Sequence, residues 1–168
     1  MDVKRVSHRE PLLIGEANQA SGRGAFDGRP GRLLAGLLGA TAEWFLHRVE
    51  AVNLLDRPQA KQPRGKGRVF DAVAARRAAS KLDLRGRAVV LAGKRVALAF
   101  GLRNPAWLSP VALGRGELVA FVTPHPSGIV QFWNGDENRR AVKKLLRKLL
   151  RCANKNPRTK GVRGRGSR

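Results

Sequence analysis

Four polar residues lie at or just beyond the ends of apolar runs in this chain: Glu16, Asn18, Asn53 and His125. Short apolar runs bounded by turn residues are typical of buried strands. In an open α/β sheet the carboxyl ends of the strands share one rim, and ligands bind in the crevice at that rim. Carboxylate, amide and imidazole groups gathered there can hold a flat polar ligand, place a water molecule and donate a hydrogen bond. The sequence therefore predicts one polar site assembled from distant segments.

The first apolar run opens the stretch from Leu12 to Gly39, LLIGEANQASGRGAFDGRPGRLLAGLLG. We expect a strand over Leu12–Ile14, a glycine-rich loop from Gly15, and a helix that resumes at Pro30. The loop carries one aromatic residue, Phe26, on a backbone that can approach a ligand closely. The alternative is a βα turn whose glycines serve only geometry.

The rest of the chain alternates between apolar strands and helices. Further strands are expected at 49–55, 88–92 and 118–122, and further helices from Thr41 and over 69–82, 93–100 and 136–151. Segments 56–67 and 102–116 each contain two prolines and are expected to be irregular. This order predicts an α/β fold, a three-layer sandwich with a central, mostly parallel four-stranded sheet and helices on both faces.

The charge of the chain is extreme for its length. Its 168 residues carry a formal net charge of +22, which suits a polyphosphate backbone or an anionic membrane. No apolar run approaches the ~20 residues that span a bilayer, and the N-terminal MDVKRVSHRE lacks the apolar segment of a signal peptide. The single cysteine, Cys152, excludes an internal disulfide and a four-cysteine metal site. We therefore expect a cytoplasmic monomer that binds nucleic acid and no membrane, without a metal ion.

The basic residues gather toward the C-terminus. We divide the chain into one domain, residues 1–152, and a basic tail, residues 153–168, which we expect to be disordered. From Arg139 to Arg168 there are thirteen lysines or arginines and no acidic residue. The helix expected at 136–151 combines an apolar stripe with basic positions around it. The candidates on this helix for binding a nucleic-acid backbone are Arg140, Lys144 and Arg147.

Five motifs in chain order resemble the uracil-DNA glycosylase superfamily: GEANQ (15–19), AFDGRPGRLLAGLLG (25–39), VNLL (52–55), VVLAGKRVALAFGL (89–102) and HPSG (125–128). The likeness covers most of residues 12–130. It is nearest to the branch whose members read GEAPG, then PFVGRAG-LL, then a strand ending in Asn, then HPS. The resemblance implies an enzyme that flips a pyrimidine out of DNA and hydrolyses its glycosidic bond. No lysine sits in a motif that would imply a Schiff-base lyase, so we expect a monofunctional glycosylase.

The resemblance also implies roles for single residues. Phe26 would stack on the flipped base, Asn53 would read its Watson–Crick edge, and His125 would hydrogen-bond its O2 atom. The backbone around Glu16 to Gln19 would hold the base or the attacking water, with Gln19 and Ser21 beside the base. The loop that enters DNA corresponds to Ser127, Gly128, Ile129 and Val130, with Ile129 or Val130 in the vacated place of the base. The plainer alternatives are core filler for Phe26, a strand cap for Asn53 and an ordinary loop histidine for His125.

The chain departs from the superfamily patterns at several positions. Ala17 occupies the place of an Asp or Asn in other branches, and Asn18 that of the Pro in GEAPG. Asn18 or Glu16 is then the candidate for positioning water, and the sequence leaves both open. The iron–sulfur cysteines of the GEAPG branch are missing, so we expect no cluster and no other cofactor.

The loop near the expected base also differs. The chain has no Tyr, so the ring that shuts out 5-substituted pyrimidines in the best-known branch is absent, and small residues follow Gln19. We expect a 5-modified pyrimidine as substrate, such as the glucosylated hydroxymethylcytosine that anti-phage members of the superfamily excise. The alternatives are a uracil-DNA glycosylase of base-excision repair and a catalytically inactive nucleic-acid-binding module. An RNA-associated basic protein is a weaker third.

Overall fold

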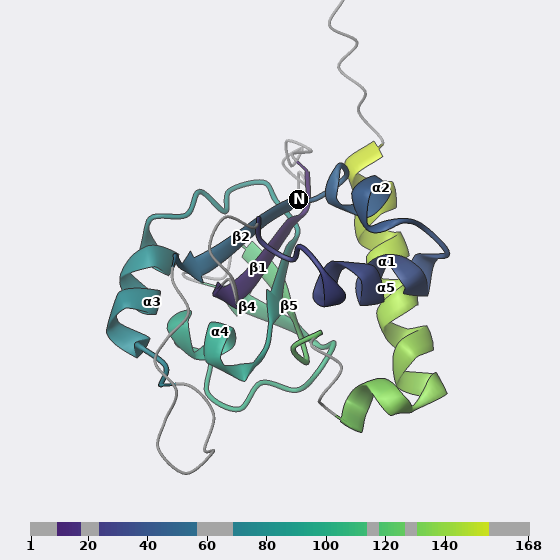
Figure 1. Cartoon of the computed structure of the whole chain (residues 1–168). Coiled ribbons are helices and arrows are strands. Elements are labelled where there is room, and N and C mark those ends of the chain that lie inside the picture. The colour runs from purple at the N-terminus through teal and green to yellow at the C-terminus, as the bar shows by residue number, and fades with distance from the viewer. Residues whose placement is uncertain (1–9, 18–23, 57–68, 114–117, 127–130, 155–168) are drawn as a thin grey trace, which may run out of the picture.

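The computed structural model describes residues 10–17, 24–56, 69–113, 118–126 and 131–154 of the chain (Figure 1). Strands and helices alternate along it, as the sequence predicts. The elements are β1 (Leu12–Ala17), α1 (Arg29–Leu38), α2 (Ala42–Leu46), β2 (Glu50–Leu55), α3 (Ala72–Ser80), β3 (Val89–Ala92), α4 (Lys94–Ala99), β4 (Pro110–Leu113), β5 (Leu118–Thr123), the 3₁₀ helix η2 (Gln131–Asn134) and α5 (Asp136–Asn154).

The strands form one sheet in the order β2-β1-β3-β5-β4. The pairs β1–β2, β1–β3 and β3–β5 are parallel, and β4 pairs antiparallel with β5 at the edge. The expectation of four strands was therefore wrong by one, because β4 lies in the segment expected to be irregular. Pro110 begins this strand, and an edge position tolerates a residue that has no N–H to donate.

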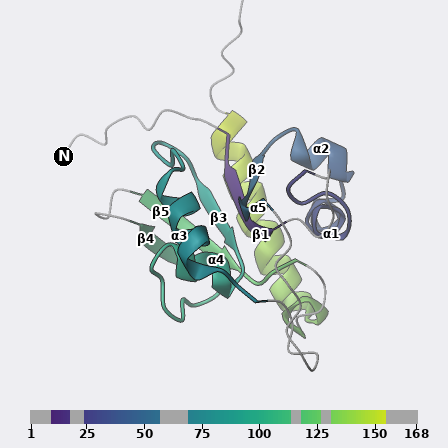
Figure 2. The same cartoon turned by 60° about the vertical axis from the view of Figure 1, so that its left-hand side comes forward.

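Helices cover both faces of the sheet, which confirms the three-layer α/β sandwich. Helices α1, α2 and α5 lie on one side, and α3 and α4 lie on the other (Figures 1 and 2). Side chains of a strand alternate between faces, so Leu13 of β1 packs toward α1 and α5, whereas Leu12 and Ile14 pack toward α3 and α4. The sheet is thus buried on both sides, as its continuous apolar strands predicted.

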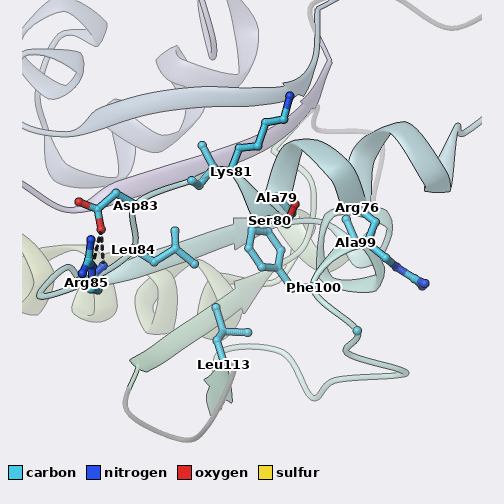
Figure 3. A pocket seen from close by; sticks show the side chains of 12 residues that line it. Arg76, Ala79, Ser80, Lys81, Asp83, Leu84, Arg85, Ala99, Phe100 and Leu113 are labelled. Carbon is cyan, nitrogen blue, oxygen red and sulfur yellow. Dashed lines mark hydrogen bonds and ion pairs between the residues drawn. The ribbon is translucent and has the colours of Figure 1, made fainter.

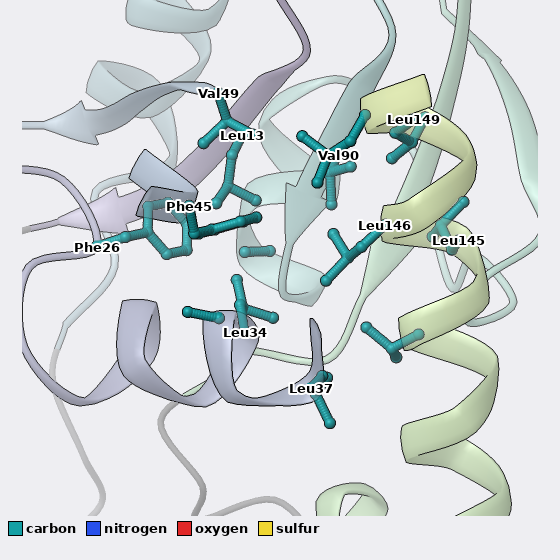
Figure 4. Close-up of a cluster of buried hydrophobic side chains, with 14 of the residues drawn as sticks. Leu13, Phe26, Leu34, Leu37, Phe45, Val49, Val90, Leu145, Leu146 and Leu149 are labelled. Carbon is teal, nitrogen blue, oxygen red and sulfur yellow. The ribbon is translucent and has the colours of Figure 1, made fainter. Parts of the chain in front are cut away.

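Helix α5 packs by its apolar stripe, which was predicted from the sequence. Its buried side chains meet those of α1 and α2 over the sheet (Figure 4): Leu145, Leu146 and Leu149 from α5, Leu34 and Leu37 from α1, and Phe45 from α2. Arg140, Lys144 and Arg147 lie on the exposed side of α5. The helix therefore buries an apolar face in the domain and presents cations to solvent.

Strand β1 is longer than expected. We predicted a loop from Gly15, but β1 continues to Ala17 because its backbone keeps pairing with β2, Gly15 opposite Asn53 and Ala17 opposite Leu55. Gly15 and Glu16 are therefore strand residues. A glycine inside a strand marks a close approach of neighbouring groups, and such an approach occurs here.

Two helices begin at side-chain caps. Thr41 accepts a hydrogen bond from the backbone N–H of Trp44, and Asp71 accepts one of 2.8 Å from that of Ala74. The Asp71 cap starts α3 at Ala72, three residues after the expected start. In the described part of the chain no helix is long and apolar enough to cross a membrane.

Candidate active site at the carboxyl rim of the sheet

Phe26 and Asn53 both approach Gly15. Gly15 and Asn53 are direct register partners in β1 and β2. A methyl group on Gly15 would collide with Oδ1 of Asn53 and would lie 3.1 Å from Cε2 and 3.2 Å from Cζ of the Phe26 ring. The ring and the amide therefore approach the same point of the β1 backbone, and only a residue without a side chain allows it.

The glycines that follow Phe26 hold it in place. Phe26 has a left-handed backbone with φ of 64°, a conformation that costs a bulky residue on the order of 1–3 kcal/mol. The backbone N–H of Gly31 donates a 3.0 Å hydrogen bond to the Phe26 carbonyl, which a side chain at position 31 would strike. Gly28 also has a positive φ, of 86°. The glycines thus serve geometry, as the plainer interpretation held, and that geometry directs the Phe26 ring to Gly15.

Phe26 is also a core residue. Its side chain is 7% exposed and packs in the cluster beneath α1 and α5 (Figure 4). The core packing fixes the ring against Gly15. Phe26 is therefore both a core residue, as the core-filler interpretation held, and a residue of the rim.

His125 follows β5 at the same rim and is half-buried. Its Cβ and Cδ2 atoms would lie 3.5 Å and 3.9 Å from a methyl group placed on Gly93, which follows β3. Its carbonyl oxygen accepts a 2.9 Å hydrogen bond from Nε1 of Trp133. The backbone and the ring of His125 are therefore both held, one by η2 and the other by the end of β3.

Burial lowers the pKa of His125 below the ordinary 6.5, and the Glu16 carboxylate opposes that shift by raising it. Desolvation disfavours the charged imidazolium, so the ring is neutral at pH 7. A neutral imidazole still carries one N–H donor. Such a donor can stabilise negative charge that develops on a leaving group.

The Glu16 side chain lies on the other side of β1 from Phe26 and Asn53. Successive strand residues point to opposite faces, so the Glu16 side chain extends toward α4. There its Oε1 accepts a 3.1 Å hydrogen bond from Nη1 of Arg95. The Glu16 side chain is 21% exposed. The carboxylate is thus at the rim, already engaged by a cation.

The structure brings four predicted residues to one rim, at the ends of β1, β2 and β5: Glu16, Phe26, Asn53 and His125. The other predicted residues of the base site, Asn18, Gln19 and Ser21, lie outside the described residues. So do Ser127, Gly128, Ile129 and Val130 of the expected DNA-entering loop. That Glu16 or Asn18 positions the water stays a prediction, with both residues as candidates.

The two aromatic residues after that loop pack inward. Trp133 of η2 is 5% exposed and belongs to the core cluster with α5. Phe132 stacks edge-on against Trp133 and tilts against Trp107, with ring centroids 5.4 Å and 6.5 Å apart. Both residues therefore pack against the core cluster that includes α5.

A groove of about 690 Å³ lies elsewhere, between the ends of α3 and α4 (Figure 3). Its lining includes Leu113, which pairs with Leu118, the first residue of β5. The groove is therefore at the amino ends of the strands, away from His125. Ligands of open α/β sheets bind at the carboxyl ends, so we assign the candidate active site to the rim.

The sequence analysis did not identify three residues that shape the rim. These are Gly15, against which Phe26 and Asn53 lie, Arg95, which binds Glu16, and Trp133, which binds the His125 carbonyl. Arg95 directly follows Gly93 and Lys94 at the end of a predicted strand. The rule that singled out His125, a polar residue after a buried strand, would have flagged it too. No sequence signal pairs Trp133 with the His125 carbonyl, because that bond depends on tertiary packing.

The fold is a three-layer α/β sandwich, and Glu16, Phe26, Asn53 and His125 lie at the carboxyl rim of its parallel strands. The family model described as the uracil DNA glycosylase superfamily matches residues 8–150. The chain therefore belongs to the uracil DNA glycosylase superfamily, whose members are hydrolases that excise bases from DNA. A search of curated proteins found no match to the sequence.

Proposed function

We propose that this protein is a monofunctional DNA glycosylase, which flips a pyrimidine out of DNA and hydrolyses its N-glycosidic bond. The observation that carries the proposal is that the Phe26 ring and the Asn53 amide both lie against Gly15. A ring held beside an amide suits a flat base with a hydrogen-bonding edge. A phosphate-binding module without catalysis has no need of this arrangement.

Hydrolysis of the N-glycosidic bond requires a hydrogen-bond donor at the leaving base and a group that positions the attacking water. Cleavage places positive charge on the sugar and negative charge on the departing base, so a donor is needed at the base. Neutral His125 is that donor in our proposal. Glu16 or Asn18 positions the water that attacks the sugar, and the abasic site is the product.

The exposed cations of α5 bind the DNA backbone in this proposal. Arg140, Lys144 and Arg147 are exposed on a helix whose opposite face is buried, and such cations bind phosphates without reading sequence. Ile129 or Val130 takes the vacated place of the base, as the resemblance implies.

The proposed substrate is a 5-modified pyrimidine, with glucosylated hydroxymethylcytosine of phage DNA as the leading candidate. The support comes from the sequence: the chain has no Tyr, and Ala20, Ser21 and Gly22 are small. A pocket wall of small residues leaves room for a substituent at C5. An added group is only weakly rejected by an apolar pocket, so exclusion would need a bulky barrier.

The test incubates the protein with duplex oligonucleotides that carry uracil, hydroxymethylcytosine or its glucosylated form, and measures alkali-labile strand breaks. We expect release of a modified base, and His125→Ala should lower that rate by roughly 10²–10³ while DNA affinity changes little. Ala20→Phe should suppress release of the modified base more than release of uracil. Release of uracil alone would indicate ordinary uracil repair. DNA binding without any base release would indicate the inactive binding module.

A further inference from the structure

Arg95 links the two sides of the candidate active site. It is the second residue of α4, and its Nη1 lies 3.1 Å from Oε1 of Glu16 at the end of β1. The residue before α4 is Gly93, against which the His125 side chain packs. The start of α4 therefore meets Glu16 through a side chain and His125 through the backbone.

The Arg95 guanidinium is held on a second side. Its Cζ lies 5.7 Å from the centroid of the Phe70 ring, within the range of a cation–π contact. The Arg95 side chain is 42% exposed and that of Glu16 is 21% exposed. A pair this exposed adds little to the stability of the fold in water.

Among the described elements beside His125, β1 and α4 carry charged side chains. Glu16 reaches it from β1 and favours its protonated form. Helix α4 brings Arg95, bound to Glu16, and Lys94, whose ammonium lies 5.7 Å from the Trp107 ring centroid. The third neighbour, η2, reads QFWN and carries no charged side chain. Glu16 is thus the charged group that favours protonation of His125, against the larger opposing effect of burial.

We propose that Arg95 is a positioning residue of this site: it fixes the Glu16 carboxylate at the rim and offsets its charge beside His125. Glu16 is then held in one direction, and its field at the imidazole is reduced by a cation at 3.1 Å. The catalytic consequence rests on the proposed glycosylase function. The electrostatic consequence does not, so the two can be tested separately.

The electrostatic test is an NMR titration of the His125 ring in the full chain. The variants are Arg95→Gln, Arg95→Lys, Glu16→Gln and the double variant Glu16→Gln/Arg95→Gln. Arg95→Gln should raise the pKa of His125, because Glu16 then acts on the ring without its counter-charge. Arg95→Lys keeps the charge and should leave the titration close to that of the parent. Glu16→Gln should lower the pKa further, and adding Arg95→Gln to it should raise the pKa by less than Arg95→Gln does in the parent, because no carboxylate is then left to move.

The double variant shows whether the effect of Arg95 on His125 depends on Glu16. If Arg95→Gln leaves the His125 titration unchanged, or shifts it equally with and without Glu16, the proposal is overturned. Far-UV circular dichroism and thermal unfolding of each variant establish that the fold is intact. If Arg95→Gln does not fold, the His125 titrations of Arg95→Lys and Glu16→Gln are compared instead. Arg95→Lys changes the shape of the cation and keeps its charge, whereas Glu16→Gln removes the charge of the carboxylate and keeps its shape.

The activity test uses the cleavable oligonucleotide in single-turnover reactions. Arg95→Gln should slow base release by up to about 100-fold, the scale of a misplaced catalytic group, with unchanged DNA affinity, and Arg95→Lys should restore part of the rate. A rate equal to that of the parent would overturn the positioning role. If the parent releases no base from any oligonucleotide, the proposed function fails, while the titration still decides the relation of Arg95, Glu16 and His125.

Discussion

The indole Nε1 of Trp133 donates a 2.9 Å hydrogen bond to the carbonyl oxygen of His125. Trp133 is buried in the cluster that joins α5 to the sheet. The backbone of the candidate catalytic histidine is therefore tied to the hydrophobic core on the α5 side. Packing that stabilises the domain also sets the position of the imidazole.

Trp133→Phe should weaken both the fold and the site. The substitution keeps an aromatic ring but removes the donor, and losing one such hydrogen bond costs about 0.5–1.5 kcal/mol of unfolding free energy. Base release should slow by less than it does in His125→Ala, because the imidazole remains. Denaturant unfolding and single-turnover cleavage measure the two effects. The matched control is Trp44→Phe at a 40% exposed position of α2, which should change neither; equal effects in both variants would contradict the role of the bond.

Gly15→Ala should displace the ring or the amide that meet at this residue. The added methyl group would collide with Asn53 and press on Phe26, and overpacking of this kind costs typically about 1–3 kcal/mol. We expect lower stability and a large loss of base release. Gly36→Ala in α1 is the control, since nothing lies within 4 Å of the added group, and it should stabilise the helix by roughly 0.5–1 kcal/mol. A Gly15→Ala protein as stable and active as the parent would show that Phe26 and Asn53 do not need their observed positions.

The lowered pKa of His125 predicts how stability depends on pH. Because the folded protein binds this proton less tightly than the unfolded chain, the unfolded state takes up more protons as the pH falls below about 6.5. The stability from a neutral His125 is complete above that pH, falls as the pH drops toward the lower folded value, and is constant below it. Urea unfolding at pH 7.5 and pH 5 should show a larger loss for the parent than for His125→Gln. Equal losses in the parent and in His125→Gln would contradict a contribution of the buried imidazole to this pH dependence.

Neutralising α5 should make DNA binding less sensitive to salt. In the triple variant Arg140→Gln, Lys144→Gln and Arg147→Gln, up to three phosphate contacts disappear, so the slope of log K against log salt becomes shallower by up to about 2.7. The control removes the same charge from the other face of the sheet with Arg76→Gln, Arg77→Gln and Lys81→Gln on and beside α3. Fluorescence anisotropy with one oligonucleotide measures both slopes. Equal changes in the two triple variants would mean that α5 is not the DNA-binding face.

The sequence by itself determined the alternation of the strands other than β4 with the helices, the parallel core of the sheet and the rim at which Asn53 and His125 lie. Apolar runs, helical periodicity and caps are local signals, read within a few residues of the chain. The same holds for the basic face of α5, because the spacing of Leu145, Leu146 and Leu149 already separates an apolar stripe from its cations.

Only the tertiary structure decided which groups touch. Strand β1 runs through Gly15 because β2 pairs with it, and β4 exists because β5 offers an edge. Glu16 and Arg95 are 79 residues apart in the chain, and their contact follows from the packing of α4 on the sheet. The lowered pKa of His125 is likewise a property of its burial. Strand pairing, burial and ion pairing depend on neighbours that are remote in sequence, and local patterns carry no information about those distances.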